Sequence, residues 1–174
     1  MTLNIRVVAL MALTGVLVVA FAALQARDEV RSAWRRSLIG QAEETGAFAR
    51  RALAAHSDLL VAERLAELAR RSEVQYVLIL DRAGKASFHG RPEDVGKVYE
   101  SSYAKAALAA TATLVQDIPE AGATEADVPL GTSGVLRLGF TLSPLAPAER
   151  WIWMTAGLAA VLIAGAWLLA ARAG

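Results

Sequence analysis

The chain has 174 residues, enough for one modest domain with accessory segments. Its formal net charge of +1 gives no overall positive field for nucleic-acid binding, and the absence of cysteine excludes disulfides, thiol catalysis and cysteine-ligated metals. At 55% hydrophobic residues the chain is too apolar for an ordinary water-soluble domain, and the excess lies at its two ends.

The first apolar run, VVALMALTGVLVVAFAAL, occupies residues 7–24 and carries no charge. A membrane-spanning helix needs about 20 apolar residues, so this run is expected to cross a bilayer. The triplet Ala20-Phe21-Ala22 resembles the cleavage site of a signal peptide, but the run is longer than the roughly 7–15 residues of a signal core. The sequence therefore favours an uncleaved first span over residues 1–25, with a short cytoplasmic N-terminus.

Residues 26–71 are predicted to form a helical stalk. Apolar residues recur at helical spacing from Val30 to Leu53, which predicts an amphipathic helix continuing from the membrane. Its apolar stripe either packs on its own domain or meets a second copy of the chain. Ser57 and Asp58 suit the start of a second helix over residues 59–71, with Leu60, Leu65 and Leu68 as its buried face, and the preceding His56 is expected to be structural.

Residues 75–97 predict two strands joined by a tight turn. An apolar run over 76–80 suits a strand, Asp81-Arg82-Ala83-Gly84 suits a turn, and residues 86–89 resume an extended pattern. Pro92 then starts a turn that Gly96 ends.

The following segments predict a helix and three further strands. The helix is expected over residues 98–110, a third strand over 113–118, a loop over 119–124, a fourth strand over 126–130 and a fifth over 135–142. Strands joined by tight turns indicate an antiparallel sheet. The predicted fold class is therefore α+β, with a five-stranded antiparallel sheet and a long N-terminal helix, and the αβ core spans residues 72–145.

The second apolar run lies within residues 149–172 and is also long enough to span a membrane. Trp151, Trp153 and Trp167 lie near its ends, where interfacial aromatic residues are favoured. Two spans would place both termini on one side and residues 26–148 on the other. Arg6 and Arg172 favour cytoplasmic termini, whereas the arginines at 27, 31, 35 and 36 argue the other way, although long translocated segments follow this rule poorly. The predicted location is the inner (cell) membrane of a bacterium, with the middle domain periplasmic or extracellular.

The order of elements, the stretch VQYVLILDRAGKASFHGRPEDVGKVYE and the closing GVLRLGFTLSPL resemble extracytoplasmic single Cache domains. These PAS-like domains occur in bacterial membrane receptors such as sensor histidine kinases and chemoreceptors. The resemblance covers residues 26–145 and implies a PAS-like sheet, a small-molecule ligand and a homodimer. Lys85 and His89 fall near positions that contact a ligand carboxylate in the citrate and fumarate sensors. Gly90 and Arg91 separate His89 from Pro92 here, so a dicarboxylate ligand does not carry over.

Seven polar residues are candidates for a ligand site between the sheet and the 97–110 region. Several are cationic, which suits a small anion, and His89 would add proton sensitivity near neutral pH. Arg137 is the most informative, because a charge among apolar strand residues either faces solvent or needs an anion or carboxylate partner. The seven candidates are Lys85, Ser87, His89, Arg91, Lys97, Tyr103 and Arg137. A divalent-cation alternative is raised by acidic residues that lack the dense spacing of a calcium loop: Glu93, Asp94, Glu120, Glu125 and Asp127.

The sequence contains no glycine-rich phosphate loop after a strand, no Gly-x-Ser-x-Gly elbow and no metal-ligand cluster. It therefore predicts no catalytic residue, no metal and no cofactor, and a chain that is not itself an enzyme. A longer native protein could carry a kinase or cyclase output domain.

The resulting hypothesis is a sensor (input) domain of a bacterial signal-transduction receptor, as in two-component systems. It would bind a small, anionic molecule and signal by movement of its transmembrane helices. Its expected partners are the lipid bilayer, a second copy of the chain, a small-molecule ligand and an output partner in the cytoplasm or membrane, without nucleic acid. The alternative is a non-sensory two-span anchor or assembly subunit whose middle domain binds another protein. A buried cavity beside Lys85, His89 or Arg137 would favour the sensor, and a filled core with an exposed apolar patch the alternative.

Overall fold

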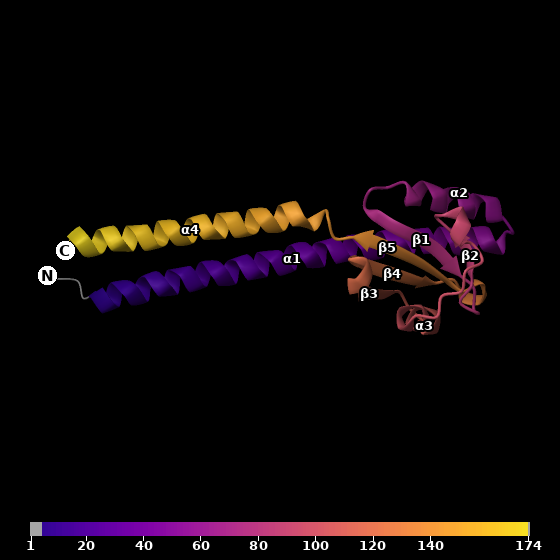
Figure 1. Ribbon diagram of the computed structural model, residues 1–174, viewed down its shortest axis with the longest axis horizontal. Coiled ribbons are helices and arrows are strands. Elements are labelled where there is room, and N and C mark those ends of the chain that lie inside the picture. Colours follow the sequence, from indigo (N-terminus) through magenta and orange to yellow (C-terminus); the bar gives the residue numbers. More distant parts are fainter. Residues whose placement is uncertain (1–4, 174) are drawn as a thin grey trace. The chain divides into compact units, whose positions relative to one another are not determined.

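The computed structural model describes residues 5–173, and the chain divides into two compact units (Figure 1). One unit comprises the residues up to Ala33 together with those from Leu145 onward, and the other runs from Trp34 to Pro144. Helix α1, Ile5–Ala54, is continuous across the first boundary.

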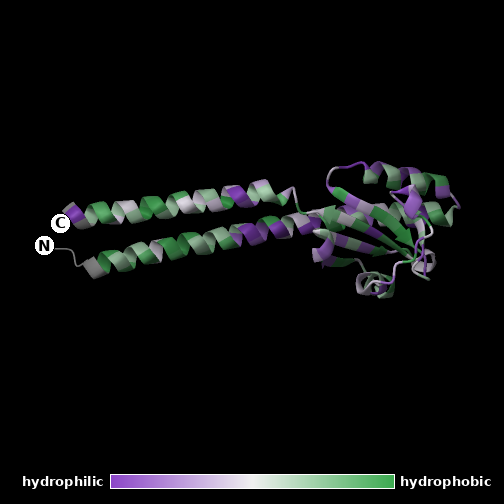
Figure 2. Ribbon diagram, viewed as in Figure 1, coloured by the Kyte–Doolittle hydropathy of each residue, from purple (hydrophilic) through white to green (hydrophobic). Residues whose placement is uncertain are grey.

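The first unit consists of two long apolar helices, the N-terminal part of α1 and α4, Leu145–Ala173. Both are long and apolar enough to cross a membrane, and Figure 2 shows the hydrophobic colouring that runs along them. The hydroxyls of Thr14 and Thr155 each donate to a carbonyl four residues earlier in their own helix, at 2.9 Å, so neither needs a water partner. Beyond the apolar stretches, Glu149 Oε1 accepts from Arg31 Nε at 2.6 Å and from Arg27 Nε at 3.4 Å.

The second unit contains the sheet. Its strand order is β2-β1-β5-β4-β3, and every neighbouring pair is antiparallel. The predicted α+β class, with a five-stranded antiparallel sheet and a long N-terminal helix, is thus confirmed. The elements are α2 (Asp58–Ala69), β1 (Val74–Leu80), β2 (Ala86–His89), α3 (Ser102–Ala109), β3 (Leu114–Ile118), β4 (Ala123–Pro129) and β5 (Val135–Thr141).

Helices cover both faces of this sheet. The C-terminal part of α1 and helix α2 pack on one face, where Leu136, Leu138 and Phe140 of β5 join the larger apolar core. Helix α3 packs on the opposite face, with Ala104 and Ala107 against Leu78, Leu80 and Val135. Successive strand residues point to opposite faces, so the residues of β5 that lie between the leucines face α3.

Two local features follow from the sequence. The β1–β2 turn has the predicted chemistry, because Asp81 Oδ1 accepts the backbone N–H groups of Ala83 at 2.8 Å and Lys85 at 2.9 Å, while Gly84 takes a φ of 79°. Helix α1 approaches β4 closely at Gly46, where a Cβ atom would lie 2.5 Å from Val128 Cγ1.

Three sequence expectations were wrong in detail. Residues 98–101 are not helical, because Val98 pairs with Lys85 in an isolated bridge and the helix begins only after the capping residue Ser101. Strand β4 begins at Ala123 rather than at residue 126, because cross-strand pairing with β3 and β5 holds its polar start in the sheet. Leu60 is 51% exposed, and Val61, one position further round the helix, is buried in its place.

Candidate functional site

A cavity of about 490 Å³ lies on the α3 face of the sheet, a volume within the range of small-molecule binding pockets. Apolar and aromatic side chains make part of its wall, and a polar network closes it on the strand side. Its lining residues are Tyr76, Leu78, His89, Arg91, Tyr99, Ser101, Ser102, Tyr103, Ile118, Glu120, Glu125 and Arg137.

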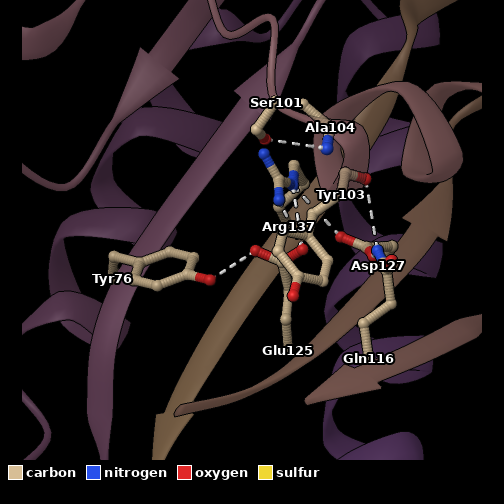
Figure 3. A network of polar contacts seen from close by, with 8 residues as sticks. All are labelled: Tyr76, Ser101, Tyr103, Ala104, Gln116, Glu125, Asp127 and Arg137. Carbon is tan, nitrogen blue, oxygen red and sulfur yellow. Dashed lines mark hydrogen bonds and ion pairs between the residues drawn. The ribbon is translucent and has the colours of Figure 1, made fainter. Parts of the chain in front are cut away.

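Arg137 of β5 lies at the centre of the polar network and is only 5% exposed (Figure 3). Its Nη2 donates to Glu125 Oε1 at 2.5 Å, and its Nε lies 3.1 Å from the same oxygen and 3.3 Å from Asp127 Oδ1. Both carboxylates are fully buried on β4. Of the two alternatives that the sequence left for Arg137, the structure shows the buried one, with carboxylate partners from its own chain.

The sheet register brings this network together. Asp127 lies directly opposite Arg137, while Glu125 lies opposite Gly139, which in turn lies opposite Tyr76 of β1. Gly139 lacks a Cβ atom, and one built there would lie 2.3 Å from the Tyr76 ring. The ring therefore lies over the glycine, and its hydroxyl donates to Glu125 Oε2.

Helix α3 is connected to the network through Gln116 of β3. The Gln116 amide donates to Asp127 Oδ2 at 2.7 Å and to the Tyr103 carbonyl at 3.2 Å. The N-terminus of α3 is capped by Ser101, whose hydroxyl accepts the Ala104 N–H at 3.2 Å. One side chain thus joins a buried carboxyl group to the backbone of the helix that forms a wall of the cavity.

Burial sets the protonation of this network. Two buried carboxyl groups share one guanidinium, so burial first, and then the charge of Glu125, raise the pKa of Asp127 to about 7, while Gln116 and Arg137 oppose the shift. Burial and the neighbouring Glu125 also raise the pKa of Tyr76, which keeps its hydroxyl a donor. Near neutral pH the buried carboxyl pair is therefore the part of this network whose charge can change.

A second corner of the cavity is built around His89, whose side chain is 3% exposed. Its Nδ1 accepts the Arg91 N–H at 2.9 Å, and its ring stacks on Tyr99 with ring centroids 6.4 Å apart. Burial lowers the pKa of His89, against the opposing charge of Asp94, so the ring is neutral near pH 7. Asp94 pairs with Lys97, and it lies 3.4 Å from Arg91 Nε.

The structure brings four of the seven predicted ligand residues to one cavity: His89, Arg91, Tyr103 and Arg137. The other three lie elsewhere among the described residues. Ser87 Oγ donates to the Ile79 carbonyl at 3.2 Å, Lys97 pairs with Asp94, and Lys85 is exposed beyond the cavity. Within residues 5–173, no group of three or more His, Asp or Glu side chains is placed to hold a metal ion.

Sequence reasoning missed the aromatic and acidic part of the site. Tyr76 and Tyr99 were assigned to a strand and a helix without a role, and Glu125 was considered only as a cation ligand. Two signals were available in the sequence. Gly139 interrupts an apolar strand, which often marks a close approach, and Glu125 and Asp127 are two residues apart, which places both on one face of a strand.

No model of a known protein family matches the chain, and no curated protein matches it either. The geometry of the cavity is therefore the basis for a functional proposal.

Proposed function

We propose that the chain is the membrane-anchored input domain of a bacterial signal-transduction receptor, and that it binds a small molecule in the cavity between the sheet and α3. The cavity itself carries the proposal. It opens to solvent, and its strand side is formed by the buried Arg137–Glu125 ion pair and by the Tyr76 ring, so convergent polar groups meet apolar walls there, as in small-molecule sites. A buried ion-pair network is weak evidence for stability, and perturbed groups that line a cavity are typical of functional sites.

The two apolar helices support the membrane part of the proposal. In this reading α1 and α4 cross the inner membrane of a bacterium, and the sheet domain, of the single Cache type, lies outside the cytoplasm. The chain has no cysteine, so one reactive thiol can be introduced without background. In intact cells a membrane-impermeant maleimide should label Ala83→Cys in the exposed β1–β2 turn, and should label Arg172→Cys only after permeabilisation. The reverse pattern would contradict the orientation.

The alternative, a non-sensory anchor or assembly subunit, has one observation in its favour. Helix α2 exposes two adjacent leucines, Leu59 at 71% and Leu60 at 51%, a small apolar surface that a partner protein could cover. The same domain holds a cavity lined by a buried ion pair, which a purely structural subunit does not require. The sensor is therefore the better-supported function.

Ligand binding is tested on the full chain in lipid nanodiscs by thermal unfolding in the presence of a small-molecule library. A ligand that binds the folded state raises the melting temperature, by mass action. Ser102→Trp, which projects a large ring from a lining position, should abolish the shift. Lys105→Trp on the same helix, outside the lining residues, should keep it. A shift that is equal in both variants would show that the ligand binds elsewhere.

A further inference from the structure

The charge balance of the network limits which ligand the cavity can take. Resting on the proposed function, we propose that the ligand carries a single positive charge, as an ammonium group does, and that it binds as the Glu125–Asp127 carboxyl pair releases one proton. This reverses the anionic ligand expected from the cationic candidates in the sequence.

The count of buried charges is the first step. Glu125 and Asp127 are each 0% exposed, and Arg137 is the cation that contacts them. Tyr76 and Gln116 also donate hydrogen bonds to the pair, but neither carries charge. With both carboxyl groups ionised, the network holds one negative charge too many. An uncompensated buried charge is costly, so the empty site keeps a proton on the pair.

The surrounding ionisable groups do not change this count. His89 is neutral, burial raises the pKa of Tyr76 and Tyr99 so that both stay protonated, and the exposed Arg91 and Glu120 have opposite charges at the solvent side. Lys97, the nearby lysine, pairs with Asp94. The ionisable lining groups outside the network are His89 and Arg91 after β2, Tyr99 and Tyr103 around α3, and Glu120 after β3.

An anion fits this site poorly. The Nε and Nη2 groups of Arg137 already donate to the two carboxylates. A bound carboxylate would add a second negative charge beside Glu125, where the Arg137 guanidinium is already neutralised, while Arg91, the other lining guanidinium, lies 3.4 Å from Asp94 at the solvent side. Close like charges in a buried site are unfavourable, since their interaction is poorly screened there.

A cation fits for two reasons. The Glu125 carboxylate lines the cavity, and of the about four acceptor positions on its two oxygens, three are occupied by the Tyr76 hydroxyl and by the Nε and Nη2 groups of Arg137, which leaves one for a ligand donor. The walls beside it, formed by Leu78, Ile118 and Tyr99, suit the apolar body of an amine. A ligand ammonium would replace the proton, which passes to solvent, and the network would stay neutral overall.

This exchange has a measurable signature. Because burial raises the pKa of Asp127 to about 7, the carboxyl pair still holds part of the exchangeable proton near neutral pH, and binding a cation releases it. By the same linkage, the affinity for the amine should increase as the pH increases. Below the pKa of Asp127 the increase should approach tenfold per pH unit, and above that pKa the affinity should level off.

The experiment is calorimetric titration of the full chain in nanodiscs with aliphatic and aromatic monoamines. Each amine is paired with the carboxylate and the alcohol of the same carbon skeleton; benzylamine, benzoate and benzyl alcohol form one such set. Repeating the titrations in phosphate and in Tris, whose ionisation enthalpies differ, gives the number of protons released. Asp127→Asn is the matched variant, because it mimics the permanently protonated carboxyl group.

The expected result is that amines bind more tightly than their paired carboxylates and release protons near pH 7. Asp127→Asn should bind amines more weakly, with no proton release and no pH dependence. If carboxylates or alcohols bind the cavity and amines do not, the inference about charge is overturned while the proposed function stands. If no member of any set binds, and Ser102→Trp leaves the unfolding temperature of the chain unchanged, the inference about charge and the proposed function are both overturned.

Discussion

Replacing Arg137 by methionine should destabilise the sheet domain severely at neutral pH. The side chain is 5% exposed and contacts two fully buried carboxyl groups, Glu125 and Asp127. Methionine fills a similar volume but supplies no charge and no donor. Breaking a buried ion pair by removing one partner typically costs about 3–5 kcal/mol.

The pH dependence of this cost follows from the structure. A carboxyl group whose pKa rises from about 4 to about 7 on folding destabilises the fold by about 4 kcal/mol at pH 7 and by about 1.4 kcal/mol at pH 5. The stability is present at low pH and is lost as the pH rises towards the folded-state pKa. Asp127 already has a raised pKa of about 7, and because Arg137 opposes that rise, its removal should raise the pKa of Asp127 further. Without Arg137 the two buried carboxyl groups also lose their compensating charge, so the cost should be larger at pH 7 than at pH 5, where protonation relieves it.

The measurement is hydrogen exchange of the β4 and β5 amides in the full chain in nanodiscs, corrected for intrinsic rates, at pH 5 and pH 7. Arg137→Met should lose most of the protection against global opening at pH 7 and much less at pH 5. The triple variant that also carries Glu125→Gln and Asp127→Asn should recover much of the loss, since it has no buried charge to compensate. A cost below about 1 kcal/mol at pH 7, or an equal cost at both pH values, would refute the assignment of a buried, charge-imbalanced network.

Three further substitutions test individual features of the fold, each by the free energy of unfolding from hydrogen exchange. Gly139→Ala should destabilise the domain by about 1–3 kcal/mol, because the new methyl group overlaps the Tyr76 ring. The control Gly40→Ala, which has open space around it, should be neutral or stabilising. Equal effects would show that the ring does not lie over residue 139. His56, just after α1, has a φ of 53°, a backbone conformation that glycine adopts more easily than other residues. His56→Gly should therefore stabilise the domain by about 0.5–1 kcal/mol, and His56→Ala should not. A similar gain from both variants would contradict the strained conformation. Ser101→Ala should weaken protection of α3 by about 1 kcal/mol, while Ser101→Asn keeps a capping group and should leave it nearly unchanged; loss in both would mean that the cap is unimportant.

Much of the fold could be predicted from the sequence because its signals are local. The β1–β2 hairpin needs only an apolar run, an aspartate that accepts turn N–H groups and a glycine that takes positive φ, and each lies within a few residues of the others. The errors fall where pairing overrides local character. Residues 123 and 124 were expected in the loop over 119–124 because they are small or polar, yet the ladders with β3 and β5 hold them in β4.

The candidate site was less predictable for the same reason. Whether Arg137 faces water or a buried pair of carboxylates depends on the register between β4 and β5, which no local pattern specifies. The acidic residues of β4 were noticed only as possible cation ligands, since their partner lies ten or more residues away. Of the four candidates that line the cavity, His89 and Arg91 lie at and just after the end of β2 and Tyr103 lies in α3, whereas Arg137 comes from the middle of β5.

The arrangement of β4 and β5 also bears on how occupancy of the cavity would reach the rest of the chain. Neighbouring residues of a strand face opposite sides, so β4 presents Glu125 to the cavity, Asp127 to the same face of the sheet, and Val128 to α1, where Gly46 permits close approach. In β5, Arg137 faces the cavity, and three residues separate the end of this strand from the start of α4. The strands that carry the cavity's charges are thus the ones packed against, or followed by, the two long helices. A ligand can shift these helices only if it binds two arrangements of the strands with different affinities, and each tenfold difference in affinity corresponds to about 1.4 kcal/mol of free energy. Close packing on the α1 face should transmit a strand shift to the helix better than loose packing would.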